Sequence, residues 1–201
     1  HTKLRALMQS QALAALVCPS SLTPLELTAA SQEGDSVISG TLTGSRDYPI
    51  EQGIPRFLPA ELAADQTVQS FNQKWEKHRY YREHTRAFYS QWYLERYDLP
   101  DLATLLDGAR NVLDAGTGSG RDALNFAEAG GSDTFVWGVD TAWEALSNTA
   151  SQIARDNLGL VQADINELPF PDGFFDVISC DQVIHHTPDP RATFANLKRK
   201  L

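Results

Sequence analysis

The sequence has little cysteine, little positive charge and no long apolar run. Its 201 residues include two cysteines, too few for a disulfide framework, so a cytoplasmic location is the default expectation. No apolar run reaches the roughly 18 residues of a membrane span, and we therefore expect no membrane partner. The net charge of −9 disfavours nonspecific binding of nucleic acid by the chain as a whole.

The remaining composition is that of an ordinary globular protein, with 42% hydrophobic and 21% charged residues. Changes in pattern along the chain predict three parts. Residues 1–59 form a β-rich module with an N-terminal helix, residues 60–108 a helical lid or linker, and residues 109–201 an α/β domain that binds a ligand. This length allows one domain with a small appendage.

The most informative stretch is NVLDAGTGSG at residues 111–120, where a short apolar strand leads to Asp114 and then to glycines at every second position. Glycine lets the backbone approach a ligand with no Cβ in the way, and the following helix points its amide groups at the same space. The stretch predicts a nucleotide-type cradle. A dinucleotide loop prefers G-x-G-x-x-G, but the third glycine position is Arg121 here, which disfavours a nicotinamide oxidoreductase.

Three further predicted strands end in polar side chains. The strand at 134–140 ends in Asp140, at the distance from the glycines where an acid accepts hydrogen bonds from ribose hydroxyls. The strand at 159–165 ends in Asp164, and the fourth runs from about Phe175 to Cys180. The residues that follow the fourth strand are Asp181, Gln182, His185 and His186. Strands that alternate with helices predict a parallel sheet, and its carboxyl-end edge would gather these side chains.

Local signals place the helices between these strands. Thr141 to Glu144 has the pattern of a capping box that opens a helix. Gly130 and Gly131 are expected to end the helix that begins at Arg121. Asp189 followed by Pro190 predicts an N-cap and the first residue of a last helix.

Taken in order, D-x-G-x-G-x-G, the two strand-end acids, LPFPDGFFDV and HH-x-x-DP resemble the motifs of class I S-adenosylmethionine-dependent methyltransferases. The resemblance implies a Rossmann-like parallel sheet and S-adenosylmethionine as the cofactor. It implies ribose contacts at Asp140, adenine contacts at Asp164, and methionine-side contacts at Asp181 and Gln182. Asp114 would either contact the cofactor or brace the loop. The full set of implied cofactor residues is Asp114, Gly116, Thr117, Gly118, Gly120, Asp140, Thr141, Asp164, Ile165, Asp181 and Gln182.

The same resemblance implies that the α/β domain is incomplete. The family's sheet has seven strands, whereas this sequence supplies four, so we expect a C-terminally truncated domain. The fourth strand would then be an unpaired apolar edge through which the chain could self-associate.

Residues 17–59 have short β-rich runs broken by proline and glycine, and they are similar to the small zinc-ribbon proteins and domains that accompany or activate methyltransferases. Tyr48-Pro49-Ile50 and Gly53-Ile54-Pro55 carry the similarity. Cys18 stands at the first ligand position. Ser21, Thr41 and Gly44 stand at the other three positions. Because structural zinc needs about four nitrogen or sulfur ligands, we predict a ribbon without metal.

Residues 61–98 are rich in aromatic and basic side chains at helical spacing. Two interpretations stay open: a lid over the cofactor or a surface for an anionic substrate, and a helix that packs on the sheet domain through its aromatic residues. The second interpretation names Trp75, Tyr81, Phe88 and Trp92 as the packing residues.

Methyl transfer from a sulfonium needs an oriented nucleophile in a dry pocket, and a general base only where the nucleophile must lose a proton. His185 and His186 are the candidate bases, although such a pair also occurs as a purely structural element. An S-adenosylmethionine-dependent methyltransferase with a small-molecule acceptor is favoured, because the chain is acidic and carries no visible RNA-binding module. The alternatives are an RNA methyltransferase and a non-catalytic partner that binds cofactor or protein.

Overall fold

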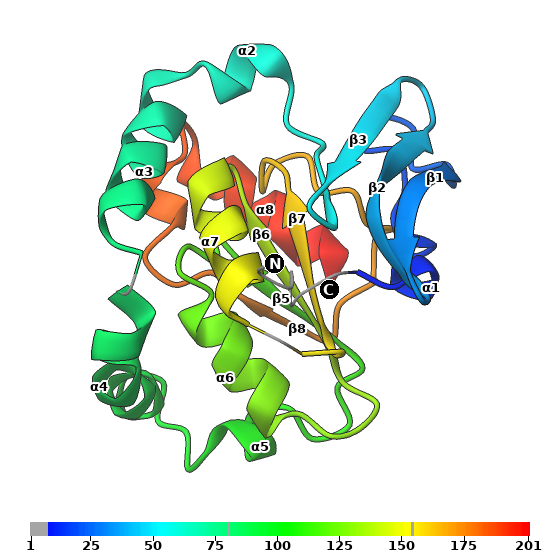
Figure 1. Cartoon of the computed structure of the whole chain (residues 1–201). Coiled ribbons are helices and arrows are strands. Elements are labelled where there is room, and N and C mark those ends of the chain that lie inside the picture. Colours follow the sequence, from blue (N-terminus) through cyan, green and yellow to red (C-terminus); the bar gives the residue numbers. More distant parts are fainter. Residues whose placement is uncertain (1–7, 80, 154) are drawn as a thin grey trace.

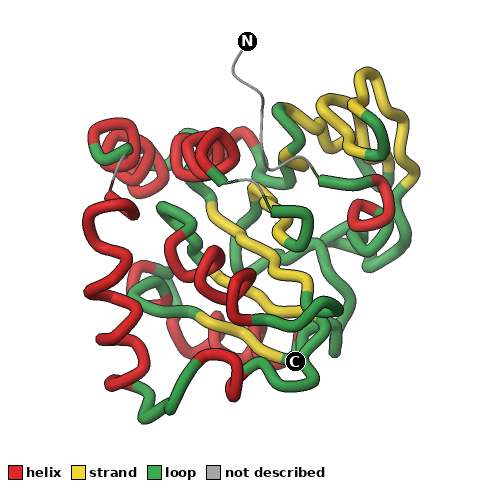
Figure 2. The backbone as a smooth tube through the Cα atoms, turned by 60° about the horizontal axis from the view of Figure 1, so that its bottom comes forward, coloured by secondary structure: helices red, strands yellow, loops and turns green. Residues whose placement is uncertain are grey.

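The computed structural model describes residues 8–79, 81–153 and 155–201. It contains a four-stranded antiparallel sheet built from the N-terminal part and a four-stranded parallel sheet built from the second half (Figure 1). In both views of the backbone, the antiparallel sheet and the long helices of the middle segment lie at opposite ends of the molecule, with the parallel sheet between them (Figure 2).

The parallel sheet has the strand order β7-β6-β5-β8. After β5 the chain adds β6 and β7 on one side, and it then crosses over to add β8 on the other side of β5. Its strands are β5 (Asn111–Ala115), β6 (Phe135–Asp140), β7 (Leu158–Gln162) and β8 (Val177–Ser179). Its helices are α6 (Arg121–Ala129), α7 (Trp143–Gln152) and α8 (Pro190–Lys200). Helices α6 and α7 cover one face and α8 lies on the other (Figure 1). The predicted Rossmann-like α/β fold with four parallel strands is confirmed, and β8 lies at an edge of the sheet.

The antiparallel sheet follows a one-turn helix, α1 (Ser10–Leu13), and its strands pair in chain order. The strands are β1 (Glu26–Glu33), β2 (Ser36–Thr43), β3 (Asp47–Glu51) and β4 (Ile54–Pro55). One hydrophobic cluster joins the two sheets, with Tyr48 and Ile50 from one and Trp137 and Val161 from the other. The N-terminal sheet therefore shares a core with the parallel sheet.

The middle segment is helical, as predicted, and consists of α2 (Ala60–Ala63), α3 (Gln66–Lys77), α4 (Tyr81–Arg96) and α5 (Leu102–Leu105). Trp75 and Trp92 pack inward: Trp75 meets the glycine loop and Trp92 contacts a core cluster. The Phe88 side chain does not pack inward: 68% of its surface is exposed. The side chain of Tyr81 lies outside the described part of the structure.

The ends of three helices test the predicted capping signals: one prediction is wrong and two are confirmed. The capping box at Thr141 does not form: α7 begins at Trp143, and its N-cap residue, Ala142, makes no side-chain cap. The first amide groups of α7 are satisfied instead by Asp140, which accepts from Ala142 N, and by Asn72 of α3. Asp189 caps α8 as expected, and α6 ends before Gly130.

Candidate functional site

A cavity of about 370 Å³ opens at the carboxyl ends of the parallel strands. Loops after β5, β6, β7 and β8 form one wall, and α2 and α3 form the roof. The residues of the predicted site that line it are Asp114, Gly116, Thr117, Gly118, Asp140, Thr141, Asp164, Ile165, Asp181, Gln182 and His186. Four motifs that are far apart in the sequence thus meet at one edge of the sheet, which is where open α/β sheets bind ligands.

The glycine loop is closely packed. Gly116 and Gly118 have φ angles of +82° and +52°, a region that favours glycine. A Cβ on Gly116 would lie 2.3 Å from a methyl group of Val183, and one on Gly118 would lie 2.6 Å from the Trp75 ring. These glycines therefore let both the loop after β8 and the roof helix α3 approach the loop.

Two predicted site residues do not line the cavity. Gly120 is the N-cap of α6 with a φ of +70°, and an added Cβ would lie 2.4 Å from Thr149 of α7. Its position serves the packing of α6 against α7. His185 belongs to the short 3-10 helix η1 (Ile184–His186), and its ring lies 4.0 Å from that of His186 without reaching the cavity wall.

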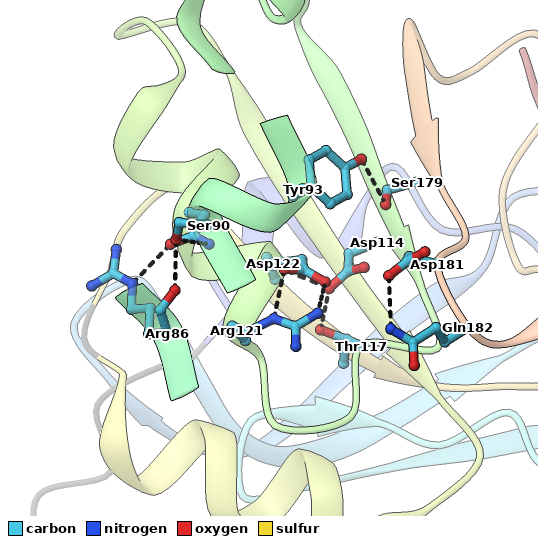
Figure 3. Close-up of polar contacts among 12 residues, drawn as sticks. Arg86, Ser90, Tyr93, Asp114, Thr117, Arg121, Asp122, Ser179, Asp181 and Gln182 are labelled. Atoms are coloured by element: carbon cyan, nitrogen blue, oxygen red, sulfur yellow. Dashed lines mark hydrogen bonds and ion pairs between the residues drawn. The ribbon is translucent and has the colours of Figure 1, made fainter. Parts of the chain in front are cut away.

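Asp114 is buried behind the glycine loop (Figure 3). Its Oδ2 accepts hydrogen bonds from Thr117 Oγ1 at 2.7 Å and from Ala123 N at 3.0 Å. Burial, followed by the charge of Asp122, raises the pKa of Asp114 to about 7. Arg121 lies beside this pair and forms a two-pronged contact with Asp122, at 2.8 and 2.6 Å. The carboxyl group of Asp114 thus braces the loop from behind.

Asp140 is half-buried and ties two loops together. Its Oδ2 accepts from Gly118 N and its Oδ1 from Ala142 N, both at 2.8 Å, and burial raises its pKa. The next acid along the sheet edge, Asp164, caps its own turn by accepting from the backbone and side-chain nitrogens of Asn166. Both carboxylates line the cavity from neighbouring strand ends.

The far side of the cavity is formed by the turn after β8. Asp181 accepts a hydrogen bond from Tyr97 Oη at 3.0 Å. Gln182, with a φ of +56°, donates to Asp181 (Figure 3). The ring of His186 meets the Phe71 ring edge-on, with centroids 5.2 Å apart. Burial, His185 and Lys74 lower the pKa of His186, which favours the neutral imidazole.

Of the residues of the roof, the sequence singled out only Trp75, as a packing residue. The others include Leu58, Leu62, Val68, Phe71 and Lys74. The aromatic-rich pattern indicated a lid, but it does not specify which helix face turns inward. Helix α3 is anchored on α7, where Glu144 N donates to Asn72 and Asn148 Nδ2 donates to the Trp75 carbonyl.

The charge of the cavity fits a cationic ligand. Besides Asp114, whose pKa is raised to about 7, its described lining contains five aspartates against one lysine and one arginine. S-adenosylmethionine carries a sulfonium and an ammonium group against one carboxylate, so its net positive charge matches this wall. The apolar roof and the strand-end carboxylates also provide the mixture of surfaces that a nucleoside needs.

Other kinds of site and anchor are not found in the described ranges. Within residues 8–79, 81–153 and 155–201, no cluster of three or more histidine, cysteine or acidic side chains is arranged to hold a metal ion. No helix in the same ranges is both long and apolar enough to cross a bilayer. Cys18 contacts the hydroxyl groups of Ser45 and Tyr48, and Gly44 lies against it. The prediction of a metal-free ribbon stays a prediction.

Comparisons with known proteins cover the second half of the chain best. Residues 113–201 match the family described as "Methyltransferase domain". The chain is 33% identical over 90 residues to the uncharacterized methyltransferase YcgJ of Bacillus subtilis, which covers 45% of this chain and 36% of that protein. It is 35% identical over 107 residues to an arsenite methyltransferase of Aquipseudomonas alcaligenes. This match covers 48% of this chain and 31% of that protein. The chain thus spans about a third of each of these relatives.

A solved structure supports the fold. A chain of the complex between the Trm112 methyltransferase activator and the putative methyltransferase of Haloferax volcanii matches with a TM-score of 0.52 at 21% identity, over 65% of this chain and 55% of that one. Residues 113–201 therefore match the methyltransferase-domain family and have a Rossmann-like fold, and S-adenosylmethionine is the cofactor that this match implies.

Proposed function

We propose that the protein is an S-adenosylmethionine-dependent methyltransferase that acts on a small-molecule acceptor. The observation that carries the proposal is that side chains of all four strand-end motifs line one and the same cavity. We further propose the division expected from the sequence: a metal-free ribbon at 1–59, a helical lid at 60–108 and the catalytic domain at 109–201.

The proposed cofactor contacts follow from the positions of the lining groups. Asp140 faces the cavity from the end of β6 and would accept from the ribose hydroxyls. Asp164 and Ile165 would hold the adenine ring, one by a hydrogen bond and the other by apolar contact. Gly116 and Thr117 would border the methionine part. That part would also meet Asp181 and Gln182 of the neighbouring loop after β8.

When bound, the sulfonium of the cofactor supplies an already activated methyl group. The work left to this chain is to orient the acceptor and to exclude water. The apolar side chains of the roof, among them Leu62, Val68 and Phe71, would keep the cavity dry. His186 is the better candidate for a general base, because it lines the cavity and its lowered pKa leaves it free to accept a proton. His185 would support it from behind.

A small acceptor is proposed for three reasons. The cavity wall is acidic, which disfavours a polyanion such as RNA. The volume of about 370 Å³ is at the low end for ligand pockets, which favours a compact acceptor over a bulky one. One relative is named for a small inorganic acceptor, arsenite. Arsenite itself is not part of the proposal, because neither Cys18 nor Cys180 is among the described residues that line the cavity.

Isothermal calorimetry with S-adenosylmethionine, S-adenosylhomocysteine and NAD tests the proposal. We expect micromolar binding of the first two and none of NAD. A screen with radiolabelled methyl donor against small molecules and RNA then measures transfer. Binding of NAD alone would refute the assignment of the cofactor. Cofactor binding without transfer to any acceptor would favour a non-catalytic partner, and transfer to RNA alone would favour an RNA methyltransferase.

A further inference from the structure

We propose that Arg56, in the N-terminal module, is a positioning residue for the cofactor site in the methyltransferase domain. It would act through the buried side chain of Gln162 on the main chain at Thr141. The inference rests on the proposed function and deepens it, because it gives the ribbon a part in holding the cofactor.

Two hydrogen bonds connect the module to the cavity wall. Arg56 Nε donates to Gln162 Oε1 at 2.8 Å, and Gln162 Nε2 donates to the Thr141 carbonyl at 2.9 Å. Gln162 is the last residue of β7, and only 2% of its surface is exposed. Both ends of one buried amide are therefore engaged, one by the ribbon and the other by the loop that follows β6.

Arg56 is itself held in place. Its guanidinium lies 4.4 Å from the centre of the Trp143 ring, a distance typical of a cation–π contact, and its Nη1 pairs with Glu51 at 2.7 Å. Its backbone forms a parallel bridge with Gln162, and Phe57 N donates to the Gln162 carbonyl at 2.7 Å. The end of the N-terminal sheet thus lies along the β7 edge of the parallel sheet.

The far end of this connection lies in the cofactor site. Thr141 lines the cavity and follows Asp140, whose carboxylate fixes Gly118 N and Ala142 N. A displaced Thr141 carbonyl would shift the backbone that aims the Asp140 carboxylate. Two residues beyond Arg56, Leu58 also lines the cavity. The ribbon therefore contributes directly to the cavity wall and also supports the loop on its other side.

A buried amide that loses one partner is costly, because its polar atom stays out of water without a hydrogen bond. Removing the Arg56 guanidinium would leave Gln162 Oε1 without its partner, and the amide would then turn to find another. That rotation would release the Thr141 carbonyl. The expected effect is a weaker grip on the nucleoside half of the cofactor, without loss of any residue that contacts it.

The test is calorimetry with S-adenosylhomocysteine on the whole protein and five variants. Arg56→Met and Gln162→Met each interrupt the connection, and the double variant tests whether they act on one path. We expect each single variant to weaken binding about 5- to 30-fold, and the double variant to be no weaker than the worse single one. Arg56→Lys should recover part of the loss. Arg155→Met removes an exposed arginine that pairs with Glu128, and it should stay within about twofold of wild type.

Stoichiometry separates positioning from simple loss of fold. A destabilised protein binds at normal affinity with fewer sites, whereas a displaced loop binds at full stoichiometry with lower affinity. Turnover gives a second readout: the KM for the cofactor should rise while kcat changes little. Unchanged affinity in Arg56→Met and Gln162→Met, or losses that simply add in the double variant, would overturn the inference alone. Failure of the wild-type protein to bind would overturn the proposed function and this inference with it.

Discussion

At the scale of single residues, Asp114 holds the glycine loop from a buried position, where its pKa is raised to about 7 by burial and by Asp122. The pKa of an aspartate in the unfolded chain is near its ordinary value of 3.8. Between these two values the folded protein keeps a proton that the unfolded chain has released. The free energy of unfolding should therefore fall as the pH rises from about 4 to about 7.

Asp114→Asn should remove that part of the pH dependence. An amide oxygen can still accept from Thr117 Oγ1 and Ala123 N, but the side chain no longer titrates. Urea denaturation between pH 4.5 and 8 should show a flatter stability curve for this variant than for wild type. Asp107→Asn, at an exposed position, is the control and should keep the wild-type slope. Equal slopes for Asp114→Asn and wild type would contradict the burial argument.

Asp140 is the proposed ribose acceptor and also holds two backbone amides, and its substitution should affect both cofactor binding and stability. Asp140→Ala deletes the proposed ribose acceptor, for an expected loss of cofactor affinity of roughly 2–4 kcal/mol. It also leaves Gly118 N and Ala142 N without their partners, so the apo protein should lose about 1–3 kcal/mol of stability. The loss of stability is expected because the carboxylate is half-buried and accepts from two backbone amides. Calorimetry and urea denaturation measure the two effects, and an affinity within about threefold of wild type would exclude the ribose role.

At the scale of elements, the roof helix α3 meets the glycine loop where the Trp75 ring lies against Gly118. Gly118→Ala should destabilise the protein, both because φ is +52° and because the new methyl group would collide with the indole. Adding Trp75→Leu to Gly118→Ala should restore the part of the stability that is lost through the collision. A double-mutant cycle from thermal melts measures this coupling, with Gly131→Ala as control because nothing lies within 4 Å of its Cβ position. Purely additive effects would show that α3 does not press on the loop.

The sequence was sufficient to locate the four parallel strands along the chain and to bring the residues that follow them to one edge, because a parallel sheet gathers its carboxyl ends there. Two strand bounds were wrong: β7 ends at Gln162, two residues before the predicted Asp164, and β8 spans only Val177–Ser179 of the predicted 175–180. It was not sufficient for the start of α7. There the expected cap at Thr141 is replaced by Asp140 and by Asn72, and Asn72 precedes Thr141 by about seventy residues. Contacts of that range depend on how helices dock. The same limit hid Arg56, because nothing in its neighbourhood along the chain indicates that it contacts Gln162.

At the scale of the whole molecule, the shared core has a testable consequence. Ile54 of the N-terminal module is fully buried against Leu146, Ala150 and Leu160 of the methyltransferase domain. Ile54→Ala should lower the free energy of unfolding by about 2–5 kcal/mol, because truncation of the isoleucine side chain leaves a cavity between the two parts. If they unfold together, the loss should appear equally in far-ultraviolet circular dichroism and in tryptophan fluorescence.

The fluorescence readout is informative because all four tryptophans lie outside the N-terminal module, at positions 75, 92, 137 and 143. A substitution at residue 54 shifts their unfolding transition only if the module and the methyltransferase domain are one cooperative unit. Phe194→Ala removes an exposed apolar side chain from α8 and should change stability by less than about 0.5 kcal/mol. Two separate transitions, with the fluorescence midpoint of Ile54→Ala unchanged, would mean that the module unfolds by itself. The ribbon would then be an appendage, and its influence on the cofactor site would have to act without a common core.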